Sequence, residues 1–89
     1  MAGPLIGLNG AEVWAYVAEL QGGLRVRFLI DDWERLGLFR GQRIPVRLPE
    51  KADQWLYLAE VTETPPTVWV TMVSGCPRKW LGDNLRRER

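Results

Sequence analysis

Alternation of apolar and charged residues constrains this 89-residue chain more than any other feature. In LRVRFLI, residues 24–30, every second side chain is apolar, and Arg25 and Arg27 occupy positions between them. Residues 43–48, RIPVRL, repeat the pattern with two further arginines and a proline on the second phase. Because successive side chains of a strand point to opposite faces, both segments predict strands with one buried and one exposed face.

Three further segments are rich in β-branched and aromatic residues and predict strands: residues 11–20, 54–61 and 68–73. The first forms a hairpin with residues 24–30 through the glycine turn QGG. Residues 11–20 and 54–61 are apolar on both alternating phases, which indicates strands covered on both faces. Pro45 has no N–H to donate, so its strand should be an edge or be bulged there.

One short helix is expected near residues 31–37. Asp31 can cap it, with Glu34 three residues later as in a capping box, and Gly37 can end it in the left-handed conformation. The order ββαβββ predicts a mainly β fold, either a small five-stranded barrel or a strongly twisted sheet. Barrels of the OB-like, SH3-like and swapped-hairpin types remain open alternatives.

The length of the chain predicts one domain. We expect an N-terminal segment over residues 1–10, a single small β domain over 11–75, and a basic C-terminal tail over 76–89. The first ten residues lack the basic residue and long apolar run of a secretory signal. No stretch approaches the roughly 20 apolar residues of a membrane span. We therefore expect a soluble, cytoplasmic protein with no membrane partner.

The chain contains no histidine and one cysteine, Cys76. A zinc site of the Cys/His type, an intrachain disulfide and a His-based nucleophile system therefore cannot be assembled within it. The acidic residues Asp31, Asp32 and Glu34 are better explained as the start of a helix than as metal ligands. We expect a non-catalytic protein with no cofactor and no metal.

A net charge of +1 conceals two basic segments. Residues 25–47 hold six arginines against three acidic residues, and residues 76–89 hold five basic residues against two acidic ones. Such asymmetry is typical of surfaces that bind polyanions. The residues expected to contact DNA or RNA are Arg25, Arg27, Arg43, Arg47, Arg78, Lys79, Arg86 and Arg87. The four on strands form one basic patch if their strands are neighbours.

Five tryptophans are many for this length, and large aromatic residues are enriched at interfaces. An exposed aromatic beside an arginine can also stack on unpaired bases. The residues expected at an interface, including that of a homodimer, are Trp14, Tyr16, Trp55, Tyr57 and Trp69.

Between residues 17 and 61 the layout resembles the AbrB/MazE-like swapped-hairpin family of DNA-binding regulators and antitoxins. The residues that carry the resemblance are Glu19, Gly22, Gly23, Arg25, Val26, Phe28, Leu36, Gly37, Leu38, Gly41, Ile44, Val46, Leu48, Leu56 and Leu58. The resemblance implies an intertwined dimer that presents arginines, Arg25 among them, to DNA. The family's Ile-Pro step is Phe28-Leu29 here, and the LGLxxGxxIxV pattern also resembles SH3-like FeoA domains.

Three functional classes follow from these patterns. The first is a nucleic-acid-binding β module that uses an outward arginine face. The second is a protein-interaction or assembly module that uses the two-faced strands and the surplus tryptophans. The third is a small-molecule-binding barrel.

Overall fold

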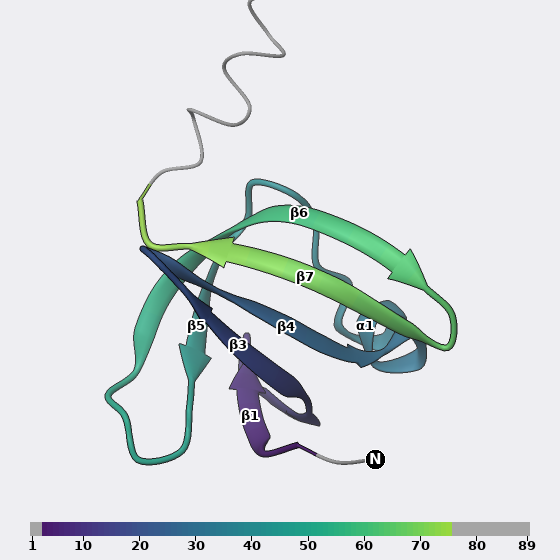
Figure 1. Ribbon diagram of the computed structural model, residues 1–89, viewed down its shortest axis with the longest axis horizontal. Helices are drawn as coiled ribbons and strands as arrows, with labels where there is room; N and C mark the ends of the chain where they lie inside the picture. Colours follow the sequence, from purple (N-terminus) through teal and green to yellow (C-terminus); the bar gives the residue numbers. More distant parts are fainter. Residues whose placement is uncertain (1–2, 76–89) are drawn as a thin grey trace, which may run out of the picture.

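A computed structural model describes residues 3–75 and shows a curled, seven-stranded antiparallel sheet with one short helix (Figure 1). The elements are β1 (Leu5–Leu8), β2 (Ala11–Trp14), β3 (Tyr16–Leu20), β4 (Gly23–Leu29), α1 (Ile30–Leu36), β5 (Arg43–Arg47), β6 (Gln54–Thr64) and β7 (Thr67–Val73). Their order across the sheet is β2-β1-β5-β6-β7-β4-β3. The expectation of a mainly β fold with one short helix is confirmed. The expected order of five strands is wrong, because seven strands form and α1 follows the fourth.

The two ends of the sheet meet at one residue. β2 and β3 occupy opposite ends of the strand order, yet only Ala15 separates them in the chain. Ala15 is fully buried, and its N–H donates a hydrogen bond of 3.0 Å to the carbonyl of Pro4. This connection curls the sheet into a half-barrel and divides the segment 11–20, which the sequence predicts as a single strand.

The core lies inside the curl, on the inward phase of the strands. On β4 the inward residues are buried and the arginines lie on the opposite phase, as the alternation predicts. β5 shows the same division. The largest fully buried side chains are Phe28, Ile6, Leu8, Ile44, Leu56, Leu58, Met72, Val26, Val46, Val68 and Val70.

The apolar residues on both phases of β6 have a cause that alternation does not reveal. The register between β6 and β7 shifts between Leu58 and Glu60, so Ala59 is an extra, fully buried residue. After this bulge the inward phase passes to Val61, which lies opposite the buried Val70, and Glu60 is exposed. The core-facing row of β6 therefore changes phase at the bulge, and the apolar residues on the other phase before it, Trp55 and Tyr57, point outward.

The helix begins and ends differently from the expected capping box. Its N-cap residue is Leu29, and no side chain caps it, so the predicted capping by Asp31 is wrong. Asp31 and Asp32 instead lie in the first turn, where negative charge is favourable. Gly37 ends the helix at φ 66° and its N–H donates to the carbonyl of Trp33, as expected for a left-handed C-cap.

The proline-containing strand β5 lies inside the sheet, next to β1. Residues 5–8, which the sequence places in an N-terminal segment, form β1 and pair with both β2 and β5. β5 is therefore an inner strand, not an edge. Its pairing with β1 stops at Val46, and the carbonyl of Pro45 accepts a hydrogen bond from Asn9 beyond that point. Because a strand residue's N–H and C=O point to the same side, Pro45 lacks its donor where the β1 ladder has already ended.

Candidate functional site

The outward face of β3, β4 and β7 gathers two arginines and two aromatic residues. In the register of the sheet Arg27 on β4 lies opposite Tyr16 on β3 and Trp69 on β7. Arg25, two residues earlier on the same face of β4, lies opposite Ala18 and Thr71. We call the set Tyr16, Arg25, Arg27 and Trp69 the β4 cluster.

The side chains of the β4 cluster stack on one another. The guanidinium carbon of Arg25 lies 4.4 Å from the centroid of the Trp69 ring. The guanidinium of Arg27 lies between two rings, 5.3 Å from Trp69 and 5.5 Å from Tyr16. Tyr16 meets Trp69 edge to face, with centroids 6.1 Å apart. A cation–π contact contributes about 0.5–1 kcal/mol at exposed sites and more where it is desolvated, so these contacts hold the arginines in place.

The charges of the β4 cluster are not neutralised by nearby acids. Within residues 3–75 the ion pairs are Arg35–Asp32, Arg47–Glu12 and Lys51–Glu19, and neither Arg25 nor Arg27 takes part in one. The Nε atom of Arg27 is buried and has no hydrogen-bond partner among these residues. Glu60 lies on the same outward face, separated from Arg25 by Thr71 of β7. The cluster therefore offers positive charge on its β3 side and meets an acid on its β6 side.

The two arginines of the β4 cluster differ in how accessible they are. Arg25 is exposed beside one ring, whereas Arg27 is half-buried near two rings that are perpendicular to each other, and its Nε atom is enclosed. The N–H groups of a guanidinium lie at the edge of its plane. This edge is the part that donates paired hydrogen bonds to phosphate or carboxylate. Arg25 therefore offers an anion the more accessible guanidinium of the two.

The other two strand arginines lie elsewhere. β5 and β4 are separated by β6 and β7, so Arg43 and Arg47 do not adjoin Arg25 and Arg27. Three strand spacings amount to about 14 Å, and curling spreads the outer face further. The expectation of one patch of four neighbouring arginines is wrong for this reason. Arg43 stacks on Trp55 at 4.5 Å, and Arg47 lies 3.9 Å from the carboxylate of Glu12.

The expected interface residues lie in three places: the β4 cluster, the surroundings of Arg43, and the end of β2. Trp14, Tyr16 and Trp55 are exposed by 56%, 50% and 51%, which leaves about half of each ring accessible to a partner. Tyr57 and Trp69 are half-buried. Trp14 lies at the end of β2 opposite Leu5, which is itself exposed. The expected contacts Arg78, Lys79, Arg86 and Arg87 lie outside the described residues.

Stacking between arginines and aromatic residues of the same chain is the feature that the sequence patterns did not indicate. The sequence does place Trp69 on the outward phase of its strand and the arginines on the outward phase of theirs. It does not indicate that these two strands, β7 and β4, are neighbours in the sheet.

Among residues 3–75 no three Cys, Asp or Glu side chains gather as metal ligands do. The same residues contain no helix long and apolar enough to cross a membrane. No known protein family, curated protein or solved structure matches the chain.

Proposed function

We propose that the protein is a non-catalytic binding module whose β4 cluster contacts single-stranded nucleic acid. The observation that carries this proposal is the pair of stacked arginines, Arg25 and Arg27, whose charges no carboxylate within residues 3–75 neutralises. Alternating arginines and aromatic rings on an open sheet suit a backbone of phosphates with bases on one side.

Single strands fit the β4 cluster better than a duplex does. Half of the Tyr16 side chain is exposed, and a base reaches the ring only when it is unpaired. The guanidinium edges of Arg25 and Arg27 then face the phosphates. Glu60 repels phosphates on the β6 side, so the nucleic acid runs along the β3 side of the β4 cluster.

Binding of labelled oligonucleotides of about 16 nucleotides, measured by fluorescence anisotropy at several salt concentrations, tests the proposal. We expect oligo-dT and oligo-U to bind more tightly than about 100 μM at low salt, with affinity that falls as salt rises. The double variant R25Q/R27Q should bind at least about tenfold more weakly. Its salt slope should be lower by about 1.4, because two phosphate contacts are lost.

The matched control is R35Q/R40Q, which removes the same charge from exposed arginines outside the β4 cluster. It should bind nearly as the unmodified protein does. An equal loss of affinity in the two double variants would show that overall charge, and not the β4 cluster, causes the binding. Binding weaker than about 100 μM at low salt would overturn the proposal.

A second candidate function is self-association through the exposed apolar side of residues 14–20. Trp14, Tyr16 and Leu20 share the outward phase of this segment and are all exposed in the single chain. Rings of this kind are frequent centres of protein interfaces. Association through this surface would make the protein an assembly module.

A further inference from the structure

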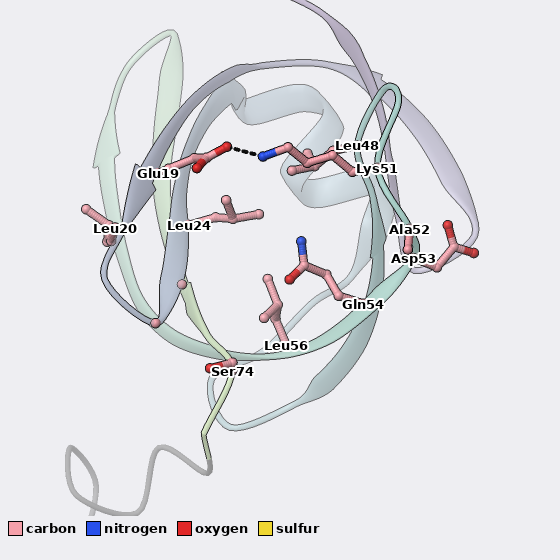
Figure 2. Close-up of a pocket in the computed structure, with 12 residues that line it drawn as sticks. Glu19, Leu20, Leu24, Leu48, Lys51, Ala52, Asp53, Gln54, Leu56 and Ser74 are labelled. Atoms are coloured by element: carbon pink, nitrogen blue, oxygen red, sulfur yellow. Dashed lines mark hydrogen bonds and ion pairs between the residues drawn. The ribbon is translucent and has the colours of Figure 1, made fainter.

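A cavity of about 490 Å³ hollows one end of the curled sheet (Figure 2). It lies where β3 and β7 end, where β4 and β6 begin, and where the loop of residues 48–53 passes. The opposite end of β4 leads into α1, which packs against β4 and β7 and covers the core there. Within the described residues the helix thus closes one end of the half-barrel and leaves the cavity at the other.

The floor of the cavity is apolar and carries one amide. Leu24, Leu48 and Leu56 form the floor and are the end of the hydrophobic core. The Gln54 side chain points in among them (Figure 2) and makes no hydrogen bond to another described residue. An amide has a hydrogen-bond donor and an acceptor side by side, so it can form two hydrogen bonds with a ligand that has an acceptor next to a donor.

The rim of the cavity is close to electrically neutral. Lys51 on the loop and Glu19 on β3 form an ion pair that spans the opening (Figure 2). Asp53 also lines the cavity, and its carboxylate points away from the centre in the same view. Because burying an unpaired charge is costly, a neutral ligand suits this interior better than a charged one.

We infer that the cavity binds a neutral, planar heterocycle of the nucleobase class that carries adjacent lactam N–H and C=O groups. The ring lies against the leucines of the floor, and its lactam edge pairs with the Gln54 amide. The cavity volume falls within the roughly 300–1,000 Å³ of small-molecule sites, and its lining is about half polar, so hydrogen bonds and apolar contacts both hold the ligand. This site is separate from the β4 cluster and does not depend on the function proposed for it.

NMR titration of the full-length, ¹⁵N-labelled protein tests the inference, with uridine as the probe. We expect shifts confined to the cavity residues, including the side-chain NH₂ of Gln54 and the amides of Leu24 and Leu56. Under the same conditions 3-methyluridine, which lacks the lactam N–H, should bind at least about tenfold more weakly.

The variant Gln54→Leu keeps the apolar contacts and removes the amide, so uridine should bind at least about tenfold more weakly to it. Gln21→Leu makes the same exchange at an exposed turn outside the cavity and should bind as the unmodified protein does. The spectrum of each variant without ligand shows whether it is folded. A folded Gln54→Leu variant that binds uridine unchanged would overturn the assigned pairing.

Oligo-U separates a free nucleoside from a base within a strand. If R25Q/R27Q abolishes oligo-U binding and leaves uridine shifts at the cavity intact, the cavity acts independently of the β4 cluster. If neither uridine nor oligo-U shifts the cavity resonances, the inference is wrong whatever the β4 cluster binds.

Discussion

Gly23, at the start of β4, occupies a position with no room for a side chain. A Cβ added there would lie 2.2 Å from the carbonyl oxygen of Met72 and 3.0 Å from the Cα of Val73. Both atoms belong to the backbone of β7, so they cannot move aside without disturbing the pairing of β4 with β7. We expect Gly23→Ala to lower the free energy of unfolding by about 1–3 kcal/mol, measured by urea denaturation.

The matched control for Gly23→Ala is Gly75→Ala, because no atom of residues 3–75 lies within 4 Å of a Cβ added at Gly75. This exchange should change the free energy of unfolding by less than about 0.5 kcal/mol. Equal stabilities of the two variants would show that β4 and β7 do not approach each other as closely as described.

At the scale of single residues, the sequence predicts which way a strand side chain points but not which side chains lie beside it on adjacent strands. The outward direction of Arg25 and Arg27 follows from alternation, because a period of two needs only the local sequence. Their stacking on Trp69 does not follow, because it requires that residues over 40 positions apart in the chain lie on adjacent strands. The same limit explains the expectation that Arg43 and Arg47 would adjoin them.

At the scale of elements, β6 depends on its bulge at Ala59. Ala59 is the extra residue, so its deletion joins the inward Leu58 directly to the outward Glu60 and the inward Val61, and the ladder with β7 becomes regular. The variant therefore keeps the same residues in the core but loses the bend of the bulge and the buried Ala59 side chain. We expect it to unfold cooperatively, as seen by circular dichroism, with a free energy of unfolding lowered by about 1–3 kcal/mol.

Deletion of Ala52 is the control for the deletion of Ala59. Ala52 is exposed in the loop before β6, outside any strand, where changes in length cost little. The variant should unfold cooperatively, with a stability within about 1 kcal/mol of the unmodified protein. Equal stabilities of the two deletion variants would show that the bulge does not support the curl of the sheet.

Strands were predictable where apolar and polar residues alternate regularly, and not where the alternation is interrupted. The strands at 24–30, 43–48 and 68–73 alternate cleanly, and β4, β5 and β7 form at those positions within a residue or two. β6 and the segment 11–20 contain a bulge and a crossing at Ala15, and both also carry exposed apolar residues such as Trp14, Tyr16 and Trp55 on the outward phase, so both phases are apolar. β1 was missed because its four residues include Gly7 and are apolar throughout, so they show no alternation.

At the scale of the whole molecule, curling places the binding features on different surfaces. The β4 cluster lies on the convex face, and the cavity opens at the end of the half-barrel where β4 begins. The exposed aromatic residue Trp14 lies beside the crossing at Ala15, where β2 ends. The β4 cluster and the self-association surface share Tyr16, but Arg25, Gln54 and Trp14 each belong to one surface only. Substitutions at these three positions can therefore separate nucleic-acid binding, nucleoside binding and self-association.

Self-association is the prediction that belongs to the molecule as a whole. The outward phase of residues 14–20 exposes Trp14, Tyr16 and Leu20, and Leu5 beside Trp14 extends this apolar surface. Burying an exposed tryptophan between two copies gives an interface the kind of anchor that dominates binding energies. Sedimentation velocity at high micromolar concentration should therefore detect a homodimer. Trp14→Ser should shift the protein to the monomer. Trp55→Ser is the control, because Trp55 is similarly exposed but stacks with Arg43, and this variant should remain a dimer. A monomer at these concentrations in the unmodified protein would reject the assembly function and leave Trp14 as a solvent-exposed residue of the β2 edge.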